Sequence, residues 1–223
     1  MVKFFIDPGH GGKDPGAVDN GLLEKDLTLK IAKCVKDLLE DYEGVEVKMS
    51  RTDDTFPSLS DRTNAANNWG ADFFLSIHIN AGGGVGYEDF VYPDSSKSIA
   101  YQNVIHTEIT KQIDMKDRGK KQGNLHVLRE SNMPAILTEC GFIDNKGDAA
   151  KLKEDDFIEK LAVGHVNGLV KAFGIKKKVS TKPAVKASET KFYRVQVGAF
   201  QNKEYALALA AELKKKGYSA IIV

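Results

Sequence analysis

The chain has 223 residues, of which 42% are hydrophobic and 28% are charged, a composition typical of a globular protein with a substantial core. This excludes a disordered chain, a collagen or a coiled coil, and no run of 18 apolar residues predicts a membrane span. Residues 1–174 hold 21 Lys/Arg and 28 Asp/Glu, whereas residues 175–223 hold 11 and 3. The net charge of +1 therefore conceals an acidic body of −7 and a basic end of +8. The basic end indicates either contact with an anionic polymer or a solvated linker.

Apolar patterning over residues 1–174 predicts strands that alternate with helices. Strands are expected at 2–7, 45–51, 72–80, 87–92, 124–129 and 134–140, and helices at 23–41, 59–69, 98–114 and 156–173. Leu27, Ile31 and Val35 recur at helical spacing in the first helix, and Ser58 with Asp61 forms a predicted N-cap pair for the second. This order predicts an α/β fold: an open, mainly parallel sheet of about six strands with helices on both faces.

The end of the chain has a different composition. Residues 175–190 are basic and include Pro183 without apolar periodicity, which predicts a linker. Residues 191–223 then contain an alternating strand at 193–200, a helix at 203–216 and an apolar strand at 219–223. This small C-terminal β-α-β fragment is short for an independent domain. The predicted organisation is a body at 1–174, a linker at 175–190 and a small module at 191–223.

The N-terminus turns at Pro8-Gly9 after a short apolar run, which is too brief for a signal peptide. We therefore expect synthesis in the cytoplasm without a signal peptide. Cys34 and Cys140 form no CxxC pair, and they are most simply buried thiols in a reduced compartment.

Ionisable residues follow three of the predicted strands. The first strand leads into Pro8-Gly9-His10-Gly11-Gly12, the strand at 72–80 carries His78 and Asn80 on one face, and the strand at 134–140 ends near Glu139. Ligands of parallel α/β sheets bind at the carboxyl ends of the strands. These side chains therefore converge on one sheet edge if the three strands are neighbours.

Imidazole and carboxylate groups are ligands that zinc favours, and a catalytic zinc keeps three protein ligands and a water. His10 is exposed by its flanking glycines, and Glu24 at the start of the first helix is a further candidate ligand. Plainer interpretations remain: the helix dipole favours a glutamate in the first turn, and His78 resembles a hydrogen-bonded core histidine. Glu139 is harder to explain structurally, because a carboxylate is costly to bury unless it is paired or used.

The other histidines are weaker candidates. His165 falls in an apolar helical series and is expected in the core, whereas His106 is expected at the surface. His126 is either a substrate contact or an ordinary strand residue. A cysteine hydrolase built on Cys140 is disfavoured, because no third orienting group is evident.

Four segments, in order along the chain, resemble the motifs of the zinc-dependent N-acetylmuramoyl-L-alanine amidases. They are residues 6–12 with Asp14 and Gly16-Ala17, residues 24–27, residues 76–81, and residues 134–142 with Asn145. The resemblance covers essentially residues 1–174. It implies His10, Glu24 and His78 as ligands of Zn2+ and Glu139 as the catalytic acid/base.

Residues 192–200 and the helix after them resemble the start of a SPOR domain, a module that binds peptidoglycan. That family has the order β-α-β-β-α-β, so the resemblance implies a partial, wall-binding module at 191–223. The whole match resembles amidases of mother-cell lysis in sporulation and phage endolysins. Both act on the wall after lysis or release.

The resemblance implies hydrolysis of the amide between N-acetylmuramic acid and the L-alanine of the stem peptide, with Glu139 moving protons of a zinc-activated water. Asn80, Arg62 and Arg129 are expected near the substrate. Two alternatives stay open: another zinc hydrolase, such as a peptidase or deacetylase, and a non-catalytic wall-binding protein. We expect a monomer that binds peptidoglycan, with the basic tail on anionic wall polymers, and neither nucleic-acid binding nor membrane insertion.

Overall fold

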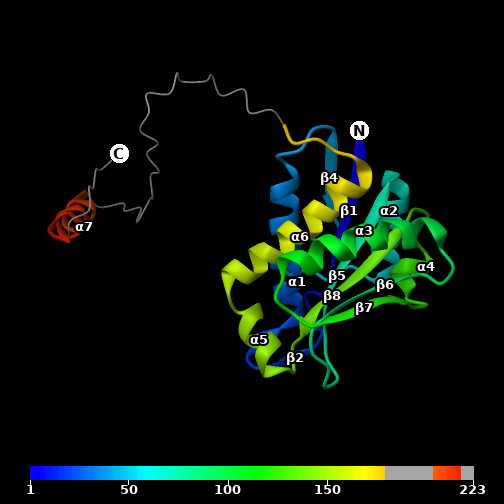
Figure 1. The fold of residues 1–223 in the computed structure, drawn as a ribbon, viewed down its shortest axis with the longest axis horizontal. Coiled ribbons are helices and arrows are strands. Elements are labelled where there is room, and N and C mark those ends of the chain that lie inside the picture. The colour runs from blue at the N-terminus through cyan, green and yellow to red at the C-terminus, as the bar shows by residue number, and fades with distance from the viewer. Residues whose placement is uncertain (179–202, 217–223) are drawn as a thin grey trace. The chain divides into compact units, whose positions relative to one another are not determined.

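The computed structural model describes residues 1–178 and 203–216 of the chain (Figure 1). The chain divides into two compact units, residues 1–179 and residues 180–223. The first unit contains the sheet and the helices that cover it.

A six-stranded sheet crosses the first unit in the spatial order β4-β1-β5-β8-β6-β7 (Figure 1). Its strands are β1 (Val2–Pro8), β4 (Val45–Met49), β5 (Phe73–Asn80), β6 (Tyr87–Val91), β7 (Asp117–Gln122) and β8 (Ala135–Phe142). Neighbouring strands pair in parallel, except for β6 and β8, which are antiparallel. A separate two-stranded hairpin is formed by β2 (Val18–Asp19) and β3 (Leu22–Leu23). The predicted open, mainly parallel sheet is confirmed.

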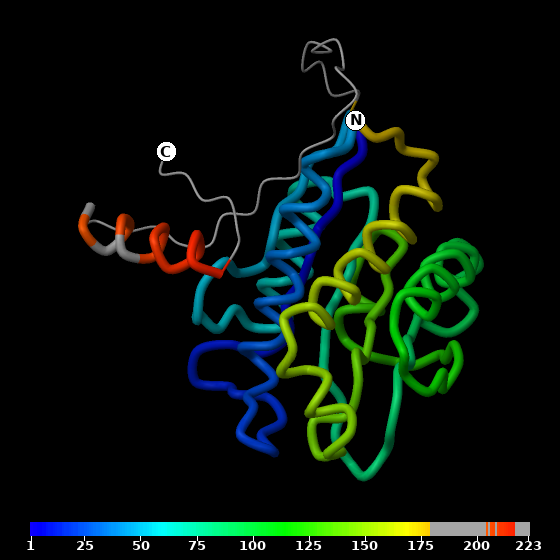
Figure 2. The backbone as a smooth tube through the Cα atoms, turned by 60° about the vertical axis from the view of Figure 1, so that its left-hand side comes forward, coloured from blue at the N-terminus to red at the C-terminus, as the bar shows by residue number. Residues whose placement is uncertain are grey.

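Helices cover both faces of this sheet, as predicted. One face packs against α1 (Glu24–Leu39), α3 (Ser96–Gln112) and α6 (Asp155–Phe173), and the other against α2 (Leu59–Trp69) and the short α4 (His126–Arg129). Helix α6 contacts both α1 and α3 (Figure 2). In β1 the alternation of a strand sends Phe4 and Ile6 to the three-helix face and Phe5 to the other. Helix α5 (Lys146–Leu152) follows β8.

Two helix starts match the sequence analysis closely. Helix α1 begins at Glu24, one residue after its predicted start. At the start of α2 the Ser58 side chain accepts a hydrogen bond from the Asp61 amide, and the Asp61 side chain accepts one from the Ser58 amide. These two bonds form a capping box.

The strand predicted at 124–129 is wrong. Residues 126–129 form α4, and Val127 and Leu128 pack with α2 against the sheet. The sixth strand is instead β7, whose sequence DRGKKQ has no apolar alternation. As an edge strand, β7 needs backbone pairing with β6 more than apolar side chains, so its sequence carried no strand pattern.

In the second unit the structure describes the helix α7 (Lys203–Lys215), close to the predicted 203–216. The strands predicted at 193–200 and 219–223, and the linker beyond residue 178, lie outside the described residues. None of the helices within the described ranges combines the length and apolar content needed to cross a membrane. Cys34 and Cys140 are free thiols, and burial raises the pKa of Cys140 to about 12.

Candidate metal and catalytic centre

The three strands that carry the candidate residues lie side by side, in the order β1-β5-β8. Pro8 of β1 pairs with Ile77 of β5, and His78 of β5 pairs with Glu139 of β8. Because the three strands are parallel, their carboxyl ends meet at one edge of the sheet.

His10, Glu24 and His78 form a compact cluster at this edge. One ligand atom of each lies within 4.8 Å of the others. Glu24 Oε1 is 3.1 Å from His10 Nε2 and 2.9 Å from His78 Nδ1. The structure therefore brings together the three predicted metal ligands, and two imidazole nitrogens with one carboxylate oxygen suit zinc.

A second carboxylate orients His10 within the cluster. Asp14 Oδ2 lies 2.9 Å from His10 Nδ1, and Asp14 Oδ1 accepts a hydrogen bond from the Gly16 amide. Carboxylates in this position commonly fix the tautomer of a metal-binding histidine, which here turns Nε2 toward Glu24. Our sequence analysis assigned no role to Asp14, although it stands four residues after His10 in the first motif.

Glycines let the backbone approach the cluster closely. A Cβ on Gly9 would lie 2.3 Å from Cε1 of His78, and a Cβ on Gly16 would lie 2.6 Å from Oε2 of Glu24. Gly16 also has a φ of +65°, a conformation that favours glycine. These two positions form a cradle that any side chain would fill.

The electrostatics of the cluster favour a bound cation. Burial raises the pKa of Glu24, but hydrogen bonds from His10 and His78 outweigh it and hold the pKa below its ordinary range. Burial lowers the pKa of His10, but the Glu24 carboxylate outweighs it and raises the pKa to about 9. The ionised Glu24 thus attracts positive charge, whether as imidazole protons or as a metal ion.

Glu139 lies beside the cluster with an unsatisfied carboxyl oxygen. Its Oε2 is buried without a hydrogen-bond partner among the described residues. Burial raises the pKa of Glu139 to about 7, and the negative charges of Glu24 and Glu88 act in the same direction against the attraction of His78. A buried carboxyl group that titrates near neutral pH is suited to proton transfer.

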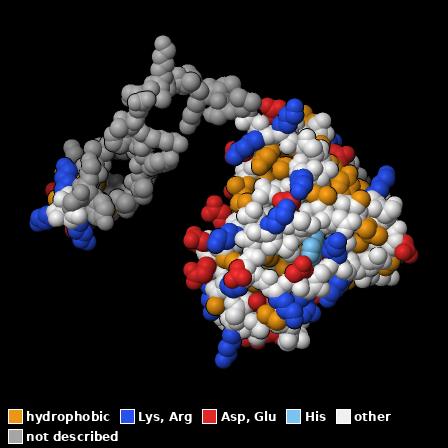
Figure 3. Space-filling model, in the orientation of Figure 1, with side chains coloured by type: hydrophobic (Ala, Val, Ile, Leu, Met, Phe, Trp, Pro, Cys, Tyr) orange, Lys and Arg blue, Asp and Glu red, His pale blue; other side chains and the backbone are white. Residues whose placement is uncertain are grey.

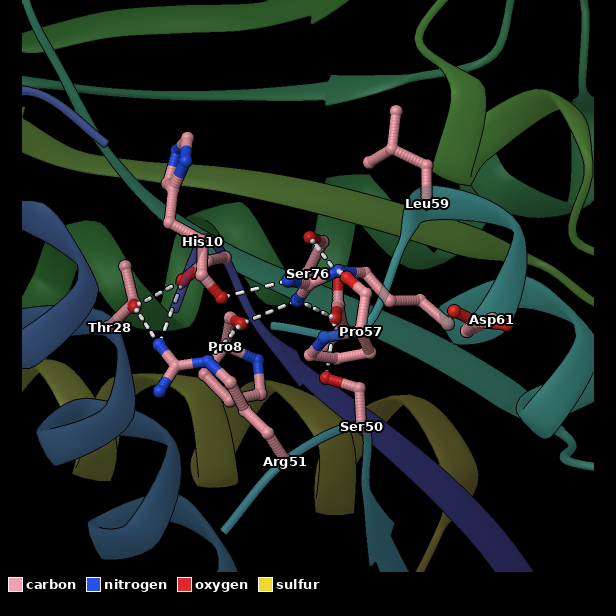
Figure 4. Close-up of polar contacts among 12 residues, drawn as sticks. Pro8, His10, Thr28, Ser50, Arg51, Pro57, Leu59, Asp61 and Ser76 are labelled. Carbon is pink, nitrogen blue, oxygen red and sulfur yellow. Dashed lines mark hydrogen bonds and ion pairs between the residues drawn. The ribbon is translucent and has the colours of Figure 1, made fainter. Parts of the chain in front are cut away.

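Arg51 and Arg62 hold the loop at residues 8–12, which carries His10, and Arg51 lies below His10 in Figure 4. Arg62 donates to the carbonyl oxygens of Pro8 at 2.7 Å and His10 at 2.8 Å, and Arg51 donates to those of Pro8 at 3.1 Å and Gly9 at 2.8 Å. The loop's backbone oxygens therefore point to the two arginines, while the His10 side chain points away from Arg51 (Figure 4).

Asp7 neutralises Arg62 within this arrangement. Its carboxylate accepts from Arg62 Nη1 at 2.7 Å, from Ser50 Oγ at 2.6 Å and from Ser76 Oγ at 2.8 Å. Arg62 is only 2% exposed, so this placement argues against the substrate contact predicted for it. Arg62 instead positions the loop.

The other two predicted substrate residues lie in different places. Asn80 follows His78 by two residues on β5, and its Nδ2 donates to Glu88 Oε1 at 2.9 Å. Arg129 is on α4, which precedes the amino end of β8, and it bonds Glu130 and Asn124. Contact of either side chain with substrate stays a prediction.

Two of the three remaining histidines have a predicted burial that the structure tests: one prediction is confirmed and one is wrong. His165 is in the core, as predicted, and its Nδ1 lies 2.7 Å from the Leu161 carbonyl oxygen. His106 is not at the surface: it is 6% exposed, because α3 turns it toward Asp89 of β6 and Asp117 of β7. Nε2 of His126 is buried and has no partner among the described residues.

Comparison with known proteins identifies two matching families. Residues 4–171 match the N-acetylmuramoyl-L-alanine amidases, and residues 189–223 match the SPOR domain. The chain is 55% identical over 225 residues to the sporulation-specific N-acetylmuramoyl-L-alanine amidase of Bacillus subtilis (strain 168), covering 100% of this chain and 85% of that protein. It is 48% identical over 181 residues to the endolysin of Bacillus phage SPP1, covering 78% of this chain and 67% of the endolysin.

A solved structure agrees with the fold. The catalytic domain of CwlV, an N-acetylmuramoyl-L-alanine amidase from Bacillus (Paenibacillus) polymyxa var. colistinus, superposes with a TM-score of 0.76 at 37% identity. The match covers 79% of this chain and 100% of that domain. Because residues 4–171 match this family and the fold is shared with a solved member, the chain belongs to the N-acetylmuramoyl-L-alanine amidase family.

Proposed function

We propose that this protein is a zinc-dependent peptidoglycan amidase that cleaves the amide between N-acetylmuramic acid and the L-alanine of the stem peptide. Membership of the family supports the bond that is cut. The observation that carries the zinc proposal is the cluster of His10, Glu24 and His78, whose ligand atoms lie within 4.8 Å of one another.

His10, Glu24 and His78 would hold the ion, and Asp14 would keep His10 in the tautomer that leaves Nε2 free. Zinc, when bound, supplies a Lewis acid that lowers the pKa of water and stabilises negative charge on the scissile carbonyl oxygen. Arg51 and Arg62 keep the loop at residues 8–12 in place through its carbonyl oxygens.

Glu139 would accept a proton from the attacking water at Oε2 and pass it to the departing alanine nitrogen. The water's hydroxyl adds to the carbonyl carbon, the C–N bond breaks, and the nitrogen leaves as an amine. A pKa raised to about 7 by burial suits a group that first accepts a proton and then donates it.

We also propose that the basic residues 175–223 attach the enzyme to the wall. The match of residues 189–223 to the SPOR domain and the charge of +8 after residue 174 support this role. Contact with anionic wall polymers, a monomeric state and access to the wall after lysis or release stay predictions.

Glu139→Gln tests these roles in the full chain. The variant should keep about one zinc per chain yet clear wall suspensions about 100-fold to 10,000-fold more slowly, because an amide cannot accept the water's proton. His78→Ala should lose zinc and activity together. Glu130→Gln, at an exposed glutamate that pairs with Arg129, is the matched control and should behave like the unaltered protein.

Product analysis completes the test. An amidase exposes new L-alanine amino termini without new reducing sugar ends, whereas a peptidase or deacetylase releases other groups. An active Glu139→Gln enzyme would remove Glu139 from its role. Undiminished clearing by protein shown to be metal-free would refute the zinc mechanism.

A further inference from the structure

Charged side chains continue across the sheet from Glu139 onto β6 and β7. Glu88 of β6 is the register partner of Glu139 on β8, so the two carboxylates lie on the same face of the sheet. Two side chains of β7 donate to Oε2 of Glu88: Nε of Arg118 at 2.6 Å and Nζ of Lys121 at 2.5 Å. The charged side chains that begin with Glu139 on β8 therefore end on β7 with two cations, Arg118 and Lys121.

Arg118 is held in position but keeps free donors. Its Nε donates a hydrogen bond to Glu88, and its Cζ lies 4.8 Å from the centre of the Phe142 ring. No residue in the described ranges accepts a hydrogen bond from its two Nη atoms, and 28% of the side chain is exposed. Stacking and one charged hydrogen bond thus pre-organise a guanidinium whose outer edge is open to a ligand.

Glu88, Arg118 and Lys121 together carry one net positive charge. Burial raises the pKa of Glu88, but hydrogen bonds from Lys121 and Arg118 outweigh it and hold the pKa below its ordinary range. Glu88 is 3% exposed, and its Oε1 is already used by Asn80. One buried carboxylate therefore faces two partly exposed cations, which favours an anionic ligand.

We propose that Arg118, assisted by Lys121, binds a carboxylate of the stem peptide, carried by an acidic residue that follows the L-alanine. This inference rests on the proposed amidase function. Guanidinium groups bind carboxylates through two parallel hydrogen bonds, which matches the free Nη pair of Arg118.

The distances suit a peptide that runs across the strands. Adjacent strands are ~4.8 Å apart, so the β7 backbone lies about 10 Å from β8, and Arg118 reaches back to Phe142 of β8. An extended peptide spans about 3.3–3.6 Å per residue. A carboxylate within the first three residues of the stem peptide can therefore reach Arg118 while the amide bond to be cleaved lies at Glu139.

The test compares two soluble muramoyl-peptides that differ only in this group, a free carboxylate against its carboxamide. The full-length enzyme should cleave the carboxylate form with a kcat/KM about 10-fold to 100-fold higher, because a charge-assisted hydrogen-bond pair is lost in the amide. Arg118→Gln should bring this ratio close to one, mainly through KM, and Arg118→Lys should give an intermediate ratio. Lys120→Gln is the matched control, since Lys120 bonds Asn103 of α3 instead of Glu88.

Equal cleavage of both peptides by the unaltered enzyme would overturn the proposal, as would an unchanged ratio in Arg118→Gln. If Arg118→Gln does not fold, Arg118→Lys and Lys121→Gln must lower the ratio, and their failure to do so overturns the proposal equally. Failure of the amidase function would look different, because the unaltered enzyme would then cleave neither peptide.

Discussion

At the scale of single residues, the buried pair of Arg62 and Asp7 supports the loop that carries His10. The side chains are 3% and 1% exposed, and Arg62 also donates to the backbone on both sides of Gly9. A buried ion pair contributes little net stability over apolar residues, but loss of one partner leaves an uncompensated charge. Arg62 is therefore sensitive to substitution although its hydrogen bonds go to Asp7 and to backbone oxygens of the loop.

Arg62→Gln should destabilise the first unit by about 3–5 kcal/mol, because Asp7 would remain buried and charged. Arg129→Gln should stay within about 0.5 kcal/mol, since Arg129 is partly exposed and its pairing with Glu130 is superficial. Denaturant unfolding followed by fluorescence measures both, because Trp69 on α2 is the only tryptophan of the chain. Equal midpoints for the two variants would contradict the supporting role of Arg62.

At the scale of elements, His106 connects a helix to two strands. Its Nδ1 lies 2.8 Å from Asp89 of β6, and its Nε2 lies 3.1 Å from Asp117 of β7. Tyr87 and Gln102 also donate to Asp89. Burial lowers the pKa of His106, but the bond to Asp89 outweighs it, so the pKa is raised above its ordinary value. The imidazolium form therefore stabilises the packing of α3 on β6 and β7.

This raised pKa predicts that the first unit loses stability at alkaline pH. The contribution of His106 is fully present below about pH 6.5, the unfolded value, and is lost as pH rises through the higher folded pKa. The free energy of unfolding should therefore fall more between pH 6.5 and 9 in the unaltered protein than in His106→Gln. His126→Gln, the same substitution at a histidine outside this network, is the control for the substitution itself. Parallel curves for all three proteins would show that His106 does not titrate in this way.

At the scale of the whole molecule, the body and the tail carry charge differently. On the face in Figure 3, acidic and basic side chains of the first unit are interspersed. The excess positive charge lies after residue 174. Residues 176 and 178 belong structurally to the body, because Glu43 N donates to Lys176 O at 2.9 Å and Lys178 N donates to Asp41 O at 2.7 Å.

Truncation after residue 178 should leave the first unit folded and zinc-loaded, with the same Trp69 unfolding midpoint. Its attachment to wall fragments should weaken, because the truncated protein lacks most of the basic residues that follow residue 174. Attachment of the full chain should also fall with added salt, which screens exposed charges. Pull-down at several ionic strengths measures both effects, and equal binding by the two proteins would leave the tail without a role in attachment.

The sequence by itself determined the sheet class, most of the helices and the candidate centre. His10 follows β1 between two glycines, His78 and Glu139 stand toward the carboxyl ends of β5 and β8, and Glu24 begins α1. The motifs around these residues resemble those of the amidase family, which assigned them to one centre. Only the tertiary structure decided which polar residues are buried. Arg62, His106 and the edge strand β7 lack any local signal, because their environments come from partners far along the chain: Asp7 for Arg62, Asp89 for His106 and β6 for β7. Burial and charge pairing over such separations depend on how strands and helices pack, which apolar periodicity along the chain does not record.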